Sequence, residues 1–221
     1  LQWNTWTLIR FQEHVDPKGN LKWLFRKDGC MHCTDAACVT SCPTGALYQT
    51  EFGTVGLNPG RCIGCKNCVA ACPFEVPKYD ASKDRVYKCD LCETRLRADR
   101  QPSCVLSCPT GALTIGRKDM MLQAAAKRVN ELGGNANIYG DRFVGGTHVL
   151  YILSEKPEVY AELPKRPAVP LSVIVWKDLL KPLSLLAAGG VLVGSFLHYL
   201  IHGPKRPDDT GETTKKEEGG E

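Results

Sequence analysis

The sequence predicts an α+β protein of short helices and small hairpins, followed by one membrane-spanning helix near its C-terminal end. Three observations predict it. The chain of 221 residues contains twelve cysteines, and all of them lie between Cys30 and Cys108. Turn residues, among them 21 Gly and 14 Pro, separate short apolar runs, as they do in small hairpins. The third observation is a stretch of twenty residues without a formal charge, from Pro182 to Ile201.

Charge and composition exclude several classes of protein. The 28 Lys and Arg against 24 Asp and Glu leave a net charge of +4, which gives no indication of nucleic-acid binding, and we expect none. The composition also excludes a wholly disordered chain, collagen and a coiled coil. No glycine-rich phosphate loop and no pair of catalytic carboxylates stands out in the sequence. We therefore expect no active site in this chain.

The cysteines fall into three groups of four, and each group ends in a Cys-Pro pair. The groups are Cys30, Cys33, Cys38 and Cys42; Cys62, Cys65, Cys68 and Cys72; and Cys89, Cys92, Cys104 and Cys108. The string Ser-Cys-Pro-Thr-Gly-Ala-Leu occurs at 41–47 and again at 107–113, which marks a duplicated unit. Three thiolates in a tight loop hold three corners of a 4Fe–4S cube, and the cysteine before proline ligates another cube. The spacing therefore predicts a tandem ferredoxin-like module, since a zinc ribbon or disulfide framework would not place a third thiol in each loop.

The crossing of the last cysteine predicts which thiols share a cube. We expect cluster A on Cys30, Cys33, Cys38 and Cys72; cluster B on Cys62, Cys65, Cys68 and Cys42; cluster C on Cys89, Cys92 and Cys104; and Cys108 in a cluster D. The fourth ligand of cluster C and the other ligands of cluster D are expected upstream of Leu1, because the chain begins without Met and enters a strand-like segment at once. In the alternative, Cys108 completes cluster C and the subunit holds three clusters.

The remaining elements follow in order. Residues 7–11 predict a strand, 53–57 and 86–87 small hairpins, Asp119–Leu132 an amphipathic helix that ends at two glycines, and 147–153 a further strand. Four prolines between Pro157 and Pro170 predict an extended linker. The expected domains are thus a cluster domain at 1–156, a linker at 157–176, a membrane helix at 177–203 and a disordered polar tail at 204–221.

The uncharged stretch has the length of a membrane span. Twenty residues at 1.5 Å each cover about 30 Å, the thickness of the hydrocarbon layer. Trp176 and Tyr199 lie near its ends, where interfacial aromatic residues belong. A buried core helix is the alternative, but the stretch follows a Pro-rich segment and precedes a polar tail. Basic residues flank both sides equally, so the sequence leaves the orientation open.

The roles of several other polar residues can be interpreted in more than one way. His32 lies between two predicted ligands, where a hydrogen bond to a cluster would tune its potential. His198, within the membrane stretch, is either a haem or quinone contact or a snorkelling residue at a helix interface. Seven basic residues lie among the motifs, either as a solvated face or to offset cluster charge and dock an acidic partner: Arg61, Lys66, Lys78, Lys88, Arg95, Arg97 and Arg100.

Taken together, the motifs are similar to those of the beta, or iron–sulfur, subunit of membrane-bound respiratory formate dehydrogenases of the N and O types. The resemblance covers the whole chain, and the strings that carry it lie at 23–33, 85–89, 145–148 and 196–199. The cysteine groups are shared with many four-cluster electron-transfer subunits, whereas the C-terminal anchor and the Gly-Gly-Thr-His string are narrower. The family's first cysteine group is absent from this sequence, which puts two of its four clusters in doubt for this chain alone.

The resemblance implies an electron-transfer role. Formate would be oxidised in an alpha subunit that holds a molybdenum or tungsten bis-pterin, and electrons would pass along the 4Fe–4S clusters. Two clusters would be complete in this chain, and up to four in the full-length subunit. The electrons would reach haem b in a membrane cytochrome b gamma subunit and then quinone. The family's subunit spans the bacterial inner membrane once, with the cluster domain in the periplasm.

Two alternatives remain open. An equivalent iron–sulfur subunit of a membrane-bound hydrogenase or of another molybdopterin oxidoreductase would have the same chain of clusters and a different catalytic partner. A zinc-bearing scaffold that tethers a complex to the bilayer is the alternative from another class. A brown protein with broad absorbance would exclude the zinc scaffold.

Overall fold

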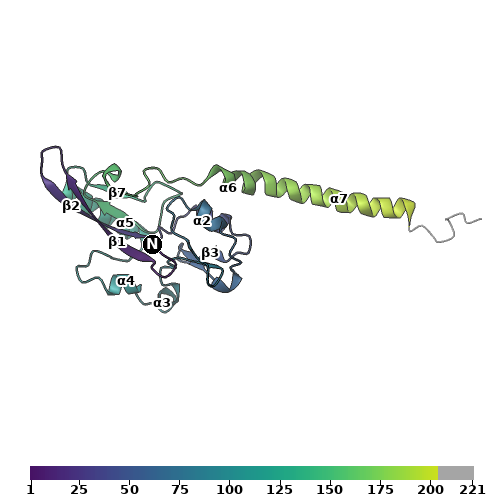
Figure 1. The fold of residues 1–221 in the computed structure, drawn as a ribbon, viewed down its shortest axis with the longest axis horizontal. Coiled ribbons are helices and arrows are strands. Elements are labelled where there is room, and N and C mark those ends of the chain that lie inside the picture. The colour runs from purple at the N-terminus through teal and green to yellow at the C-terminus, as the bar shows by residue number, and fades with distance from the viewer. Residues whose placement is uncertain (204–221) are drawn as a thin grey trace, which may run out of the picture. The chain divides into compact units, whose positions relative to one another are not determined.

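The computed structural model describes residues 1–203, and the tail expected to be disordered, 204–221, lies outside these residues. The chain divides into two compact units, one from Leu1 to Ile174 and one that begins at Val175. Figure 1 shows the described elements in chain order. The first unit contains all twelve cysteines and the second contains the long apolar helix, so each is described by itself.

Eight short strands pair two by two into antiparallel hairpins. The strands are β1 (Thr7–Val15), β2 (Leu21–Gly29), β3 (Leu47–Gln49), β4 (Val55–Leu57), β5 (Lys78–Asp80), β6 (Arg85–Tyr87), β7 (Asn137–Tyr139) and β8 (Tyr151–Leu153). The helices are α1 (Ala37–Thr40), α2 (Asn67–Ala71), α3 (Glu93–Arg97), α4 (Ser103–Leu106), α5 (Lys118–Leu132), α6 (Leu171–Val175) and α7 (Lys181–His202). Single turns are η1 (Pro59–Arg61), η2 (Pro157–Val159) and η3 (Trp176–Leu180).

The first hairpin is the longest. β1 and β2 pair from Thr7 opposite Gly29 to Val15 opposite Leu21, so the strand expected at 7–11 continues for four more residues. Asp16 closes the turn, because its carboxylate accepts the backbone N–H groups of residues 18 and 20. Phe11, Trp23 and Phe25 share one face of the hairpin, pack on one another and remain more than half exposed.

A repeated unit follows the hairpin. In α1, α2 and α4 the second residue is the third cysteine of its group, namely Cys38, Cys68 and Cys104. After the first two groups the chain makes a small hairpin, β3–β4 and then β5–β6. Helices of four or five residues do not persist alone in water. α1 and α2 are held by a core in which Cys38 and Cys68 pack with the apolar side chains of Leu47, Val55 and Val86.

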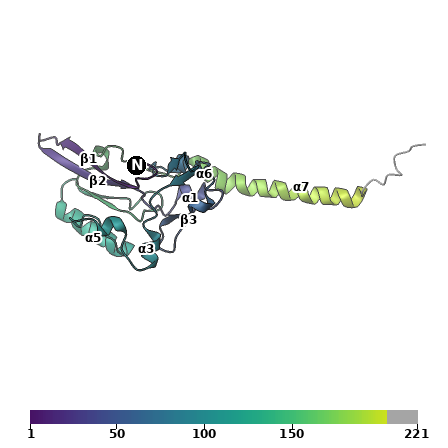
Figure 2. The same cartoon turned by 60° about the horizontal axis from the view of Figure 1, so that its bottom comes forward.

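A second core lies between the first hairpin and the β7–β8 hairpin. It contains Leu24, Tyr139 and Leu153 together with Tyr160 and Leu163. The β1–β2 hairpin and α5 lie at one end of the first unit, and α1 and β3 lie at the other (Figures 1 and 2). The predicted amphipathic helix is confirmed as α5, whose Ala125 is buried.

The segment expected to be a linker differs from that expectation over most of its length. Tyr160 and Leu163 are buried in the second core, and the Tyr139 hydroxyl donates to the Pro164 carbonyl at 2.6 Å. Val173 packs on the alanines of α1 and α2, and the first unit continues to Ile174. Apolar residues lie between the prolines, so the proline-rich composition did not indicate a free linker.

The strand expected at 147–153 is confined to β8, at 151–153. Thr147 instead forms an isolated antiparallel bridge with Cys33, and the His148 N–H donates to the His32 carbonyl. The Thr147 N–H donates to the Gly140 carbonyl and the His148 N–H to the first cysteine loop, so neither of these donors has a strand partner.

The second unit has a continuous helical path with one irregular turn. The helix Leu171–His202 is long and apolar enough to cross a membrane, and it is the one such helix between residues 1 and 203. At Trp176–Leu180 the turn is π-helical. Pro182 explains this position, because its ring would clash with the carbonyl of residue 178 and it has no N–H to donate there.

We expect Gly140→Ala to destabilise the first unit. Gly140 has φ +106°, and an added Cβ would lie 2.5 Å from Thr147 Oγ1 and 2.8 Å from the Val149 carbonyl oxygen. The control is Gly19→Ala, at φ +85° with no atom within 4 Å of the added Cβ, which carries only the backbone cost of about 1–2 kcal/mol. Overpacking should add about 1–3 kcal/mol at Gly140. The measurement is the apparent unfolding temperature of the purified complex, and equal shifts for both variants would contradict the close packing of residues 140 and 147–149.

Candidate metal centres

The first two cysteines of each group lie on the same kind of turn. The residue just before the second cysteine is left-handed in all three groups, with φ +49° at His32, +69° at Gly64 and +57° at Leu91. This conformation is uncommon for residues other than glycine, although Asn, Asp and His adopt it more often than the rest. The three Cys-x-x-Cys segments therefore share one backbone turn although only the second contains glycine. Sequence reasoning missed this shared turn for that reason.

The last cysteine of the first and third groups lies in a loop of backbone donors. Burial opposes ionisation of Cys42, but the N–H groups of residues 44, 46 and 47 and the Thr44 hydroxyl lower the pKa of its thiol. Around Cys108 the Thr110 hydroxyl and the N–H groups of residues 110, 112 and 113 lower the pKa to about 7. The two copies of the repeated string thus fold alike, with Gly45 at φ +64° and Gly111 at φ +65°.

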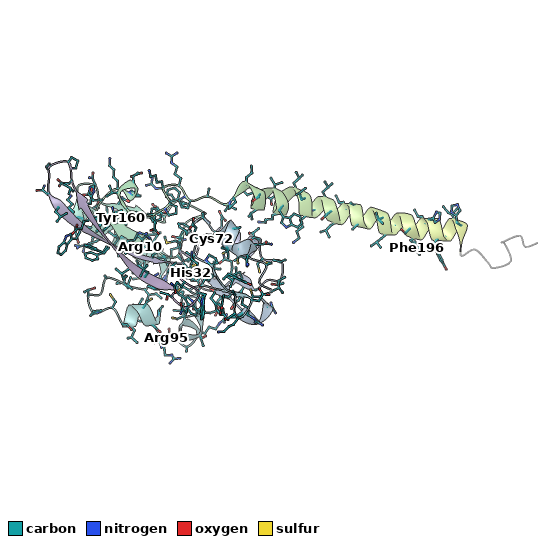
Figure 3. All side chains as sticks on the ribbon, in the orientation of Figure 1. Arg10, His32, Cys72, Arg95, Tyr160 and Phe196 are labelled. Atoms are coloured by element: carbon teal, nitrogen blue, oxygen red, sulfur yellow. The ribbon has the colours of Figure 1, made fainter. Side chains whose placement is uncertain are left out.

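The last cysteine of the second group lies among the thiols of the first group. Burial, together with the neighbouring Cys30 and Cys72, raises the pKa of Cys33 to about 12. The pKa of Cys38 is raised in the same way, by burial and then by Cys30 and Cys72. Figure 3 labels Cys72 in the cysteine-bearing unit, near His32. These four thiols are the set predicted for cluster A.

The reverse exchange is seen around the second group. Burial raises the pKa of Cys68 to about 12, and the next contributions come from Cys42, Cys62 and Cys65. A small hollow is lined by the same four cysteines together with apolar side chains that include Leu47 and Val86. The thiols around this hollow are the set predicted for cluster B.

The third group is more open. Burial raises the pKa of Cys104, Lys27 lowers it, and Cys89 and Cys92 raise it, so these three thiols are neighbours. The largest influences on Cys108 come instead from its own loop. Leu106, between them on α4, is 67% exposed.

The donor sets fit iron–sulfur clusters better than single ions. A zinc ion needs four thiolates about 2.3 Å from one point. Within residues 1–203, no three His, Cys, Asp or Glu side chains converge closely enough to hold one metal ion. A cube spreads its four ligands over four irons. His32 Nε2 is also buried without a hydrogen-bond partner in the described structure, which leaves it free to donate to cluster sulfur.

A segment far along the chain covers the first cysteine loop. Thr34 N–H donates to the Gly146 carbonyl at 2.9 Å, and Asp35 N–H donates to the Val144 carbonyl at 2.8 Å. The backbone N–H and Nδ1–H of His148 both donate to the His32 carbonyl at 3.0 Å. Residues 144–148 thus fix the conformation of the loop that contains Cys30 and Cys33. The sequence linked 145–148 to the family resemblance and 147–148 to a strand, and it did not predict this contact; Gly145-Gly146 was the available signal for a close backbone approach.

The basic residues among the motifs differ in how far they are buried. Lys88 is 3% exposed, whereas the other basic residues among the motifs are at least partly exposed. His198 lies on α7, where its ring stacks on that of His202 with centroids 4.3 Å apart. Figure 3 shows this part of α7, with Phe196 labelled.

Comparison with known proteins gives two family matches. Residues 21–118 match the 4Fe-4S dicluster domain, and residues 169–212 match the transmembrane segment of formate dehydrogenase N. The chain is 46% identical over 211 residues to a formate dehydrogenase iron-sulfur subunit of Haemophilus influenzae, covering 92% of this chain and 67% of the relative. It is 43% identical over 215 residues to the nitrate-inducible formate dehydrogenase iron-sulfur subunit of Escherichia coli, covering 94% of this chain and 73% of that relative.

The cluster region alone is also similar to subunits of other enzymes. The thiosulfate reductase electron transfer subunit of Salmonella typhi is 49% identical over 96 residues, which is 43% of this chain and 50% of the relative. The match to the C-terminal segment therefore distinguishes between kinds of complex, and the cysteine pattern alone does not.

Proposed function

This chain belongs to the family of formate dehydrogenase iron–sulfur subunits, and we propose that it relays electrons from formate oxidation, through the clusters assigned below, to an acceptor in the membrane. It is an electron-transfer component that carries 4Fe–4S clusters. The observation that carries the proposal is the exchange of thiols, in which Cys72 lies among the first group and Cys42 lines the hollow of the second.

The cysteines have the following proposed roles. Cluster A binds to Cys30, Cys33, Cys38 and Cys72, and cluster B binds to Cys62, Cys65, Cys68 and Cys42. Cluster C takes Cys89, Cys92 and Cys104 with a fourth ligand from outside this sequence, and Cys108 ligates cluster D. The largest influences on Cys108 come from its own loop, whereas those on Cys104 include Cys89 and Cys92, and this difference supports the four-cluster version over the three-cluster alternative.

The bound clusters supply one-electron redox chemistry, and the chain's residues hold and shield them. The three left-handed turns present pairs of thiolates, and the loops after Cys42 and Cys108 surround the sulfur with N–H groups. Hydrogen bonds to a thiolate stabilise its charged form. Burial of Cys30, Cys38 and Cys68 keeps water from the cluster positions. Outer partners of this kind set the potential of a metal centre.

The membrane arrangement completes the proposal. The match to a formate dehydrogenase transmembrane segment and the apolar helix Leu171–His202 indicate membrane anchoring. We further propose that the subunit spans the bacterial inner membrane once, with its cluster domain in the periplasm. Its partners would be a molybdenum or tungsten bis-pterin alpha subunit and a cytochrome b gamma subunit with haem b. The exposed aromatic face of β1–β2 supports burial of this subunit in an assembly.

The test is cluster reduction in the complex purified in mild detergent. Formate is added without oxygen, with hydrogen gas as the parallel donor, and electron paramagnetic resonance follows the reduced clusters. We expect signals with formate alone. Reduction by hydrogen alone would assign the chain to the hydrogenase alternative, and a colourless, zinc-loaded protein would exclude clusters.

A further inference from the structure

The His32 side chain is buried and hydrogen-bonded through one ring nitrogen, whereas its other ring nitrogen has no partner among the described residues. Its side chain is fully buried, and its Nδ1 accepts the Val55 N–H at 3.0 Å. Since Nδ1 accepts, the ring proton of the neutral imidazole is on Nε2, which therefore is a donor. That donor has no partner among residues 1–203. An unsatisfied buried donor costs about 1–3 kcal/mol, so a native structure rarely keeps one without an acceptor.

The surroundings of the ring indicate where the acceptor is. Cys30 of the first group and Cys89 of the third are the thiols that interact with the His32 ring. Burial raises the pKa of Cys89 and the nearby His32 ring lowers it, so the ring and this thiol are neighbours. His32 therefore lies between the ligands of cluster A and those of cluster C. Its left-handed backbone, at φ +49°, is a strained conformation for histidine and is fixed by the His148 contacts.

Lys88 is the second unusual buried group. Its ammonium donates to the Val55 carbonyl at 2.5 Å and to the Cys89 carbonyl at 2.8 Å. Neither acceptor is charged, and no carboxylate forms an ion pair with Lys88 within the described residues. A buried charge is costly unless an opposite charge lies nearby. The negative groups on which Lys88 acts are the thiolates of Cys30, Cys33 and Cys38, although Lys88 itself precedes a ligand of the third group.

The backbone of one residue, Val55, joins the two buried side chains. The Val55 N–H donates to His32 and the Val55 carbonyl accepts from Lys88, and Val55 is 1% exposed on β4. A dry, low-dielectric setting strengthens such a network. The three residues thus form one hydrogen-bonded connection from the first cysteine loop to the third.

We propose that His32, Val55 and Lys88 form a buried bridge between clusters A and C that raises the potentials of both clusters and fixes their spacing. The inference rests on the proposed cluster assignment. His32 Nε2–H donates to sulfur at the junction, and the Lys88 ammonium offsets the negative charge of cluster A. One-electron reduction adds one negative charge to a cluster, and a nearby donor and ammonium stabilise that charge. Both residues are positioning residues, since they act on the clusters through hydrogen bonds and charge.

Lys88 has a matched control in this chain. Lys66 also adjoins a predicted ligand, Cys65, but it is exposed and its ammonium lies over the Tyr79 ring. Water and salt screen an exposed charge far more than a buried one. In potentiometric titrations of the purified complex, we expect Lys88→Met to shift the midpoint potential of cluster A downward. Lys66→Met should shift no cluster by a comparable amount, and Lys88→Arg should restore most of the potential because it keeps the charge.

The role of His32 is tested by replacing it with the residues that occupy the equivalent position in the other two cysteine turns. His32→Gly copies Gly64 and His32→Leu copies Leu91, so each replaces histidine with a residue that occupies the same left-handed position elsewhere. We expect both variants to lower the potentials of clusters A and C and to leave cluster B within experimental error. If one of the two variants loses iron, the midpoint potentials are measured on the other variant.

The outcomes separate this inference from the proposed function. If the wild-type complex shows formate-reducible clusters and the iron-replete variants keep wild-type potentials, the bridge is wrong and the electron-transfer role stands. If Lys66→Met and Lys88→Met shift potentials equally, burial of Lys88 is irrelevant and the bridge is again wrong. If the wild-type complex contains no reducible cluster, the cluster assignment fails first.

Discussion

Replacing Cys65 with alanine is expected to remove cluster B and to stop electron flow through the subunit. Cys65 is the one exposed thiol among the twelve, so the substitution removes little packing and mainly deletes a ligand. The complex should lose about four iron atoms, since a cube contains four. Formate-dependent quinone reduction should fall by more than about 100-fold, because even partners beyond the ligands cost 10- to 100-fold.

The matched control lies in the same cysteine loop. Asn67, the first residue of α2, is exposed and supplies no ligand, so Asn67→Ala should keep the iron content and the rate. Iron analysis and quinone reduction are measured on the same preparations. Wild-type quinone reduction by Cys65→Ala would contradict the ligand assignment for cluster B.

Ending the chain after Lys181 is expected to release the subunit from the membrane. The deleted stretch from Pro182 to Ile201 contains ten Leu, Ile, Val and Phe residues. At −0.3 to −0.6 kcal/mol each, they favour insertion by about 3–6 kcal/mol. The fraction bound to carbonate-washed membranes should therefore fall by at least about 100-fold, since each 1.4 kcal/mol is a factor of ten.

A second truncation controls for chain length. Ending the chain after Gly203 removes residues 204–221 and leaves the helix Leu171–His202 intact, so membrane binding should be unchanged. Retention of the Lys181 truncation in washed membranes at the wild-type level would show that other contacts anchor the subunit and that this helix does not.

The local patterns in the sequence predicted most of what depends on near neighbours. The helix expected from Asp119 starts one residue earlier, at Lys118, and ends at Leu132 as expected. The small hairpins expected around residues 53–57 and 86–87 are β3–β4 and β5–β6. These elements were predictable because spacing, turn residues and caps all lie within a few residues of one another.

Contacts between distant residues were not predictable in this way. Residues 144–148 pair with a loop more than 100 residues earlier, so their backbone leaves the strand that Thr147 to Leu153 otherwise suggests. Tyr160 and Leu163 pack against strands that no local pattern connects to them. For His32 the sequence predicts a hydrogen bond to a neighbouring cluster, but not its contact with the third cysteine group. The importance of this residue depends on Val55, Lys88 and Cys89, which come together only in the folded chain.

The exchange of thiols between the first two groups also constrains how the protein is made. Cys72 lies among Cys30, Cys33 and Cys38, and Cys42 lies with the second group. Under the proposed assignment, cluster B lacks a ligand until residue 68 has left the ribosome, and cluster A lacks one until residue 72 has done so. A nascent chain that stops between the groups would hold two incomplete sites. Under this assignment each cluster needs cysteines from both groups, so neither can be completed before residue 68 of the second group has been translated.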